Sequence, residues 1–255
     1  MKHSFIDRYS DRASPIHRLD PRTKIATAII FVIMVVVIPP GEWQAFAIYF
    51  LFLSLLTLIT KVPPLYILKR SLVVIPFVVL IGIFIPFLKT GGSSGSYNVW
   101  MWDIPKSNLI LFGSIIMKSW LSVICLVLLT ATTRFSDVLR GLEQLHMPKT
   151  MVMILSFMYR YIFVLTDEVL RMKQARDSRS LGEKRSRQIK TIGNMIGTLF
   201  LRSYERGERV YAAMISRGFD GEIRTLSTTT MRATDLLYTF SFLIIISVAC
   251  LSLAF

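Results

Sequence analysis

The stretch LILFGSIIMKSWLSVICLVLLTA, residues Leu109–Ala131, contains a single charged residue, Lys118. A helix needs about 20 apolar residues to cross the ~30 Å hydrocarbon core of a bilayer. The stretch meets this requirement, so it predicts a transmembrane helix. The same criterion predicts four further spans in the rest of the chain, at residues 23–38, 43–60, 72–88 and 236–255. The third of these is interrupted by Pro76 and Pro86.

The composition favours a membrane protein with a large cytoplasmic face. Apolar residues make up 53% of the 255-residue chain, yet its formal net charge is +14. Soluble nucleic-acid-binding proteins are basic but less apolar, so the composition argues against that class. The two cysteines, Cys125 and Cys250, lie inside apolar runs. They are too few for a disulfide framework and are expected to be packed or lipid-facing thiols.

The distribution of basic residues predicts the orientation of the spans. The first 24 residues and the loop Lys61–Arg70 are basic, whereas the turn Pro39–Glu42 has no basic residue. Basic residues also outnumber acidic ones over residues 134–232. Since cytoplasmic loops carry the excess of lysine and arginine, the N-terminus is expected inside, the segment Lys89–Ser107 outside and the C-terminus outside.

One apolar segment, Met151–Leu165, does not fit this pattern. It is short and contains Arg160, and a charge at the bilayer centre costs roughly 2.5–3.5 kcal/mol. A further span here would also place the basic segments that follow it outside. We therefore expect a helix that lies at the interface or packs against the spans, although a spanning helix stays an alternative.

Beyond residue 134 the pattern becomes that of amphipathic helices. A short helix is expected over Phe135–Leu145, followed by two long ones over Lys149–Arg179 and Arg185–Arg217. The second long helix carries an apolar seam suited to helix–helix contact, with a Gly193-xxx-Gly197 step that lets two helices cross closely. The members of the seam are Ile189, Ile192, Ile196, Leu199, Val210 and Met214.

Both long helices end in the same kind of element, an arginine between two small residues. The first is Ser178-Arg179-Ser180 and the second is Ser216-Arg217-Gly218. Either element alone is explained as a helix stop, because arginine favours the negative end of the helix dipole and glycine takes the left-handed position after the last turn. The repetition suggests more, because small neighbours leave a guanidinium exposed to bind a carboxylate of another protein.

Three stretches carry a resemblance to a known family: IDRYSDRASPIHRLDPRTK (Ile6–Lys24), FMYRYIFVLTDEVLRMKQARDSRSLG (Phe157–Gly182) and FLRSYERGERVYAAMISRGFDG (Phe200–Gly221). The chain resembles the transmembrane T component of energy-coupling factor (ECF) transporters, and most closely the CbiQ branch that serves cobalt uptake. In that family two long cytoplasmic helices cross, and each ends in a small–Arg–small motif that docks into a groove of an ATPase subunit.

The resemblance implies which residues contact the ATPases. By position, the coupling residues would be Ser178, Arg179 and Ser180 at the first site, and Ser216, Arg217 and Gly218 at the second. Arg176 is a rival for the first arginine, one turn earlier, but its neighbour Asp177 is not small. The resemblance also implies that the helices cross, for which Gly193 and Gly197 are the candidate contact.

Partners and cofactors follow from the same resemblance. The chain would couple two copies of a CbiO-like ABC-type ATPase to a CbiM/CbiN-like substrate-binding membrane subunit, in the bilayer of a prokaryotic cell membrane and without nucleic acid. It would bind no cofactor itself, since the ATPases bind ATP. The sequence agrees: it lacks a GxxxxGK[ST] loop, and its three histidines lack metal-ligand spacing, so no catalytic or metal-binding residue is assigned.

Other functions stay open from the sequence. The substrate could be nickel or a vitamin instead of cobalt. A membrane enzyme would need metal-binding carboxylates such as Asp167-Glu168, for which pairing of Asp167 with Arg171 is the simpler explanation; a secondary transporter would need repeated halves with broken helices. We predict an all-α integral membrane protein with about five spans. Its expected parts are a cytoplasmic segment 1–22, spans 23–133, a coupling module 134–231 and a final span 232–255.

Overall fold

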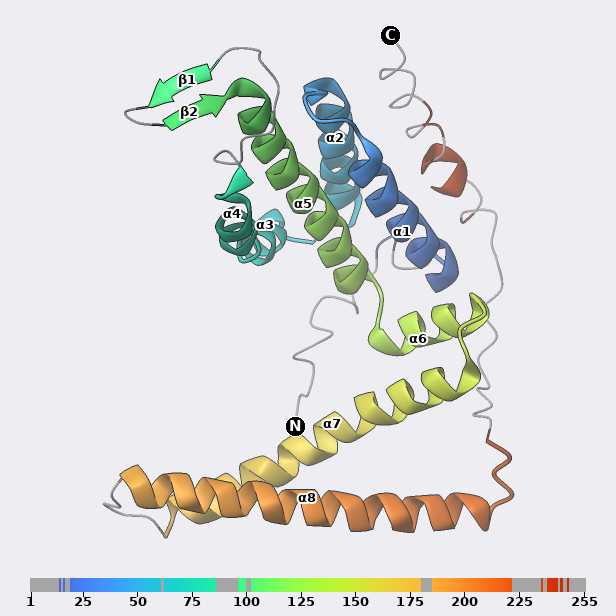
Figure 1. Cartoon of the computed structure of the whole chain (residues 1–255). Coiled ribbons are helices and arrows are strands. Elements are labelled where there is room, and N and C mark those ends of the chain that lie inside the picture. Colours follow the sequence, from blue (N-terminus) through green and yellow to red (C-terminus); the bar gives the residue numbers. More distant parts are fainter. Residues whose placement is uncertain are drawn as a thin grey trace. The chain divides into compact units, whose positions relative to one another are not determined.

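The computed structural model (Figure 1) describes residues 14, 16, 19–60, 62–85, 96–99, 102–179, 185–221, 235, 238–242, 244 and 247. The chain divides into two compact units. The larger one, called here the membrane unit, consists of residues 2–145 and 229–255. The smaller one, called here the coupling module, consists of residues 146–228.

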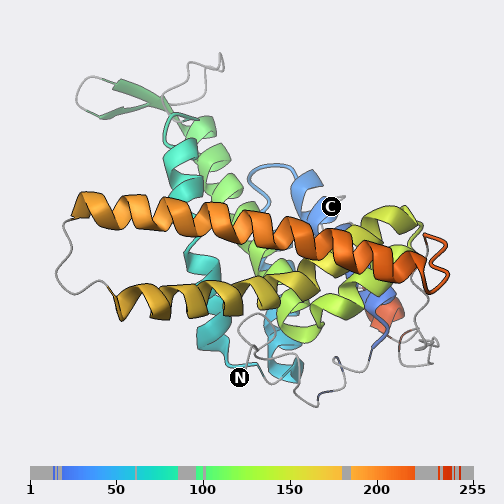
Figure 2. The same ribbon diagram turned by 90° about the horizontal axis from the view of Figure 1, so that it is seen from below.

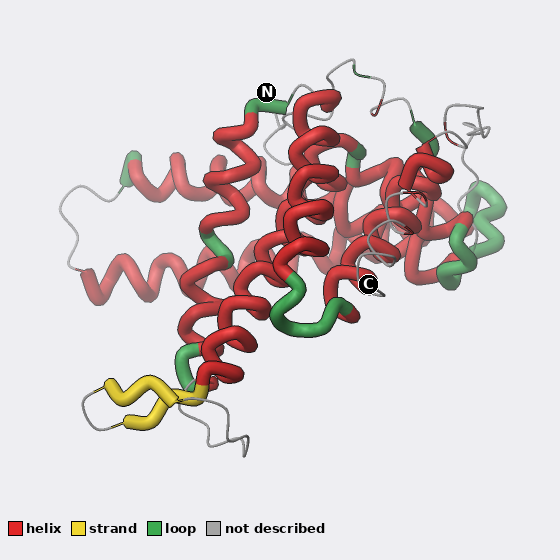
Figure 3. Tube along the Cα trace, turned by 90° about the horizontal axis from the view of Figure 1, so that it is seen from above, coloured by secondary structure: helices red, strands yellow, loops and turns green. Residues whose placement is uncertain are grey.

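The described part of the chain is helical apart from one short hairpin, which Figure 3 shows in yellow. The predicted all-α membrane fold is therefore confirmed. The membrane unit contains α1 (Pro21–Val37), α2 (Trp43–Thr60), α3 (Pro64–Leu72), α4 (Ile75–Gly82), β1 (Ser96–Val99), β2 (Trp102–Pro105), α5 (Lys106–Thr132) and α6 (Phe135–Gln144). The coupling module contains α7 (Lys149–Asp177) and α8 (Arg185–Ile215).

Helix α5, which contains the apolar stretch Leu109–Ala131, is the centre of the membrane unit. It contacts α1, α2, α3 and α4, and its Leu121 is completely buried. Beside it, Phe31 of α1 meets Tyr49 of α2 edge to face, with the ring centroids 5.4 Å apart. Apolar side chains of α1, α2 and α5 thus share one core, and buried hydroxyls such as those of Thr27 and Ser114 donate to carbonyls of their own helix.

The third predicted span differs from the structure. We expected one helix over residues 72–88, but the chain forms α3 and α4 with a turn between them. Pro76 explains the break, because a proline ring clashes with the carbonyl of the residue four positions earlier. That residue is Leu72, where α3 ends. Helix α3 begins at Pro64, a favoured first position for proline, so most of the expected loop Lys61–Arg70 is helical.

The hairpin β1–β2 lies in the segment 89–107 that was expected to be an external loop. Its strands pair antiparallel, with Ser96 opposite Pro105 and Val99 opposite Trp102. The sequence did not predict it, because the connection lacks the Asn-Gly or Asp-Gly signal of tight hairpins.

Four of the described helical stretches are long and apolar enough to cross a membrane: Trp43–Thr60, Pro64–Gly82, Lys106–Thr132 and Lys149–Asp177. The last of these is α7, which we had expected not to span. Helix α1 is one residue shorter than the shortest of the four, at 17 residues. The predicted final span 236–255 lies mostly outside the described residues.

The boundary between the two units also differs from the expected one. Helix α6 was assigned to the coupling module, which was expected to begin at residue 134. In the structure it packs against α1 and belongs to the membrane unit. The module therefore begins at His146, next to the helix break that Pro148 imposes.

Candidate functional site

The second arginine element is held rigidly by the way in which α8 ends. Gly218 takes a left-handed conformation, with φ of 78°. Its N–H donates to the carbonyl of Ile215 at 2.9 Å, and the N–H of Phe219 donates to the carbonyl of Met214 at 3.1 Å. These two bonds form a Schellman motif. It places Arg217 at the C-cap, two residues after the end of α8, where its side chain is exposed.

The first arginine element is built in a similar way. The hydroxyl of Ser178 donates to the carbonyl of Ala175, and the hydroxyl of Ser216 donates to the carbonyl of Ala213, both at 3.0 Å. Each serine hydroxyl is therefore bonded within its own helix end, and the arginine that follows is exposed. The third member of the first element, Ser180, lies outside the described residues.

The two candidates for the first coupling arginine differ in their partners. Arg176 makes an ion pair with its neighbour Asp177, at 2.6 Å from Nη2 to Oδ1, and only 23% of its side chain is exposed. The side chain of Arg179 is exposed and makes no recorded hydrogen bond or ion pair to the described residues. A guanidinium without an internal acceptor can bind an external one at lower cost. The structure thus favours Arg179 over Arg176.

The two elements lie toward opposite ends of α8, as Figure 2 shows for the ends of the two helices. Helix α8 has 31 residues, which corresponds to a length of about 46 Å at ~1.5 Å per residue. One acceptor site cannot reach both arginines over this distance. The arrangement requires two separate acceptor sites.

An ion-pair cluster joins α7 and α8 where they cross. Glu168 of α7 accepts from Arg171 at 2.7 Å and from Arg202 of α8 at 2.6 Å. Only 15% of the Glu168 side chain is exposed. The hydrogen bonds from Arg171 and Arg202 lower the pKa of this carboxyl below its ordinary value. The structure thus pairs Arg171 with Glu168, whereas the spacing along the helix predicted Asp167.

The glycine step is not at this crossing. A Cβ atom added at Gly193 or at Gly197 would meet no atom within 4 Å, so none of the described helices lies against either glycine. The expectation that they bring α7 and α8 together has to be corrected. Two arginines on one carboxylate join the helices instead.

Large apolar side chains lie exposed along both helices of the module. The predicted seam is only partly covered, because Ile189 and Ile196 are more than 60% exposed whereas Leu199, Val210 and Met214 are half-buried. On α8 the exposed set continues with Phe200, Leu201, Tyr204, Tyr211 and Ile215. Apolar surface of this extent marks a site of contact with protein or membrane.

The described residues do not form a site for metal chemistry. In this part of the chain, no group of three or more histidine, cysteine, aspartate or glutamate side chains comes close enough to hold a metal ion.

Comparisons with known proteins agree with this description. A model of the CbiQ cobalt transport protein family matches residues 12–229, which include both arginine elements. The energy-coupling factor transporter transmembrane protein EcfT of Listeria innocua is 28% identical over 232 residues, covering 87% of this chain and 86% of the relative.

Two relatives with named metals match over shorter stretches. The cobalt transport protein CbiQ of Rhodobacter capsulatus is 31% identical over 100 residues, covering 39% of this chain and 41% of its own length. The nickel permease LarQ of Lactiplantibacillus plantarum is 32% identical over 120 residues, covering 47% of this chain and 42% of its own length.

Proposed function

The chain belongs to the CbiQ family of cobalt transport proteins, and on this premise we propose that it is the membrane coupling subunit of an ATP-driven importer of the ECF type. In this function the membrane unit lies in the bilayer, and the coupling module receives movement from a pair of ABC-type ATPases. A separate membrane subunit binds the substrate. This chain binds neither ATP nor a cofactor and catalyses no reaction.

The observation that carries the proposal is the pair of exposed arginines, Arg179 and Arg217, each held at a helix end. An arginine offers five N–H donors in a planar fork that matches a carboxylate. We expect each to enter an acidic or polar groove of one ATPase copy. Their separation along α8 fits two copies, one at each end of the helix pair, better than one.

The length and rigidity of the helices support a mechanical role. Movement of the two ATPases during ATP hydrolysis would displace the two arginines, and the helices would carry that displacement as stiff levers. The ion-pair cluster around Glu168 keeps the levers together, so that displacement of one helix acts on the other. A conformational change is transmitted only through contacts whose free energy differs between the two states.

Cobalt is the substrate that we propose for the importer, since the family model carries that description. The match to the nickel permease LarQ makes nickel the second candidate. The decisive experiment is co-purification of the tagged full chain with the ATPases and the substrate-binding subunit, followed by ATP-driven uptake of Co²⁺ and of Ni²⁺ into proteoliposomes. Uptake of neither ion, or a chain that binds no ATPase, would refute the proposal.

The orientation is part of the proposal and has its own test. A cysteine placed at Ser94 should react with a membrane-impermeant thiol reagent added outside intact cells, and one placed at Ser186 should not. If α7 crosses the membrane, as its length and composition allow, the position that follows it would be labelled from outside. That result would overturn the cytoplasmic placement of the module.

A further inference from the structure

The first turn of α1 is joined to the C-terminal part of the chain. Asp20 caps α1, its Oδ1 accepting from the N–H of Arg22 at 3.0 Å. The N–H of Asp20 in turn donates to Oδ1 of Asp235 at 2.9 Å. In a capping box this second bond goes to a side chain three residues further along the helix. Here a carboxylate 215 residues away replaces it, and both aspartates are almost fully buried.

The same turn holds α6. Nε of Arg22 donates to Oε1 of Gln144, the last residue of α6. Gly141 brings the helix close: a Cβ atom there would lie 2.7 Å from Cδ1 of Ile25 and 3.2 Å from the carbonyl carbon of Pro21. A side chain at position 141 would therefore push α6 away from α1.

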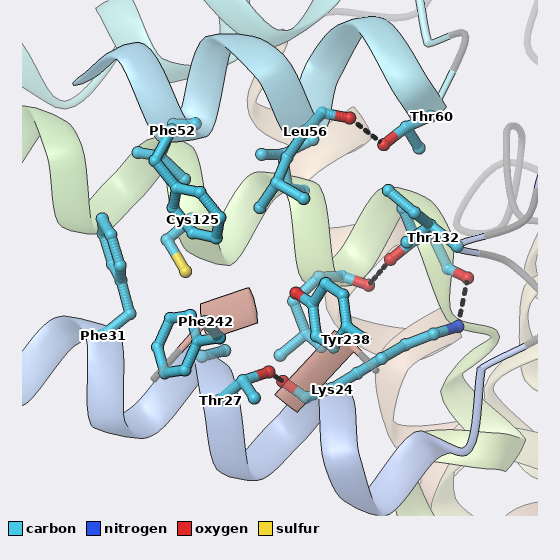
Figure 4. Close-up of a pocket in the computed structure, with 15 residues that line it drawn as sticks. Lys24, Thr27, Phe31, Phe52, Leu56, Thr60, Cys125, Thr132, Tyr238 and Phe242 are labelled. Atoms are coloured by element: carbon cyan, nitrogen blue, oxygen red, sulfur yellow. Dashed lines mark hydrogen bonds between the residues drawn. The ribbon is translucent and has the colours of Figure 1, made fainter. Parts of the chain in front are cut away.

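A third contact fixes α5. Nζ of Lys24 donates to the carbonyl of Thr132, the last residue of α5, at 3.3 Å (Figure 4). The last carbonyls of a helix lack partners within the helix and favour a cation. Lys24 borders a cavity of about 50 Å³ that Tyr238 and Phe242 of the C-terminal part also line. Phe242 packs on Phe52, with ring centroids 5.8 Å apart.

These contacts have one feature in common. The chain leaves the membrane unit for the coupling module through α6, and it returns ahead of Asp235. Both connections are thus fastened to the same turn, Asp20–Lys24. We propose that this turn is the anchor through which movement of the coupling module reaches the spans, with Arg22 and Asp235 as its positioning residues. The inference rests on the proposed function.

The physical reason is that a covalent connection alone transmits little movement. A chain segment that is free to reorient absorbs displacement, whereas one held by buried, directional hydrogen bonds passes it on. If the anchor is lost, the module should still bind ATPases through its arginines. Its movement would be absorbed in the loosened connections, so ATP would be hydrolysed with less uptake.

The experiment uses the assembled transporter in proteoliposomes. It measures the amount of ATPase that co-purifies with the tagged chain, and the Co²⁺ taken up per ATP hydrolysed. Asp235→Ala and Arg22→Ala should keep normal ATPase binding and lower uptake per ATP by about fivefold or more, the low end of coupling between sites. Asp235→Asn keeps an acceptor for the N–H of Asp20, so it should retain the parent's ratio.

Two further variants guard against a general loss of folding. Gly141→Ala should lower uptake per ATP, and adding Ile25→Val, which removes the Cδ1 atom nearest to the new methyl group, should restore part of it. Arg140→Ala is the matched control on α6, because its ion pair with Asp137 stays within that helix. It should behave as the parent does.

Failures of the two proposals can be told apart. A parent chain that binds no ATPase would refute the proposed function itself. If the parent is coupled and Asp235→Ala and Arg22→Ala keep its uptake per ATP, the anchor is refuted and the proposed function stands. If these variants lose ATPase binding and uptake together, or if Asp235→Asn fails as Asp235→Ala does, the turn serves assembly in general and the inference is overturned.

Discussion

Two basic residues of the membrane unit, Arg22 and Lys24, differ from two basic residues of the coupling module, Arg179 and Arg217, in what their side chains contact. Arg22 and Lys24 are engaged inside the fold, by Gln144 and by the carbonyl of Thr132. Arg179 and Arg217 are exposed, and the described residues show no acceptor for their side chains. The role of a lysine or arginine side chain in this chain thus depends on whether the fold itself supplies a hydrogen-bond acceptor for it. A basic side chain with an acceptor inside the fold stabilises the structure. One without such an acceptor can bind a carboxylate of a partner protein.

Apolar residues show the same contrast. In the membrane unit Phe31 and Tyr49 are no more than 2% exposed, whereas in the module Ile189 and Phe200 are each 67% exposed. The membrane unit has a core of its own. The module has long helices with little to cover them, as expected of a part that completes its packing only in a complex.

The largest expected effect comes from removing both exposed arginines. Arg179→Ala and Arg217→Ala should each weaken ATPase binding by at least tenfold, about 1.4 kcal/mol, because a hydrogen bond to a charged group contributes roughly 1.5–3 kcal/mol. The double variant should abolish the complex and transport. Lysine should restore little at either position, since it lacks the planar fork. Pull-down of the ATPases measures the effect, and normal binding by both single variants would contradict it.

A smaller effect separates the two candidate arginines of the first element. Arg176 is satisfied by Asp177, so Arg176→Ala should weaken ATPase binding much less than Arg179→Ala in the same pull-down. This difference in ATPase binding would show that an arginine paired inside the fold contributes less than an exposed one. A larger loss for Arg176→Ala would show that binding breaks its internal pair and that Arg176 is the coupling residue.

The crossing of α7 and α8 should depend on pH. The carboxyl of Glu168 has a pKa below its ordinary value of about 4.5 because of Arg171 and Arg202. A group of this kind stabilises the crossing above its unfolded pKa and loses the effect as the pH falls through its folded pKa. Spin labels on the two helices should therefore report a broader distance distribution once the pH falls below the lowered pKa of Glu168.

Variants that remove one charge test whether the ion pairs of Glu168 cause this pH dependence. Glu168→Gln should broaden the distribution at neutral pH and remove its pH dependence. Glu205→Gln is the matched control, because its pair with Arg209 lies within α8, at 3.6 Å and with both side chains more than 60% exposed. An unchanged distribution for Glu168→Gln would mean that the ion pairs do not hold the crossing.

The smallest effect is expected at the glycines of α8. Since Cβ atoms at Gly193 and Gly197 would meet open space, alanine at both should leave the crossing unchanged and stabilise the helix by about 1 kcal/mol per site. Gly207→Ala, with the same open surroundings, is the control. The thermal unfolding of the purified chain measures the gain. A loss of partner binding confined to the first two positions would show that a partner packs on them.

Much of the fold follows from local pattern. Apolar runs of sufficient length predicted the helices 43–60 and 106–132 to within a few residues, because in a bilayer every backbone group must be satisfied inside the helix. Gly218 predicted the end of α8, since few residues other than glycine adopt a positive φ. Pro76 was noticed as an interruption, and the break it causes at Leu72 follows from its ring. The family resemblance and the two arginine elements could also be predicted from the sequence, because the residues of each motif are contiguous in the chain.

The choice among possible partners of a side chain depends on packing between segments that are distant in the sequence. The sequence offers Arg171 two neighbouring carboxylates, and the approach of Arg202 from α8 draws Glu168 into the crossing. It could not show that Asp235 would reach the N–H of Asp20 across 215 residues, or that α6 belongs with the spans. Local rules operate within a few residues along the chain, whereas these pairings depend on which distant segments packing brings together. For that reason the helix ends were predictable and the anchor was not.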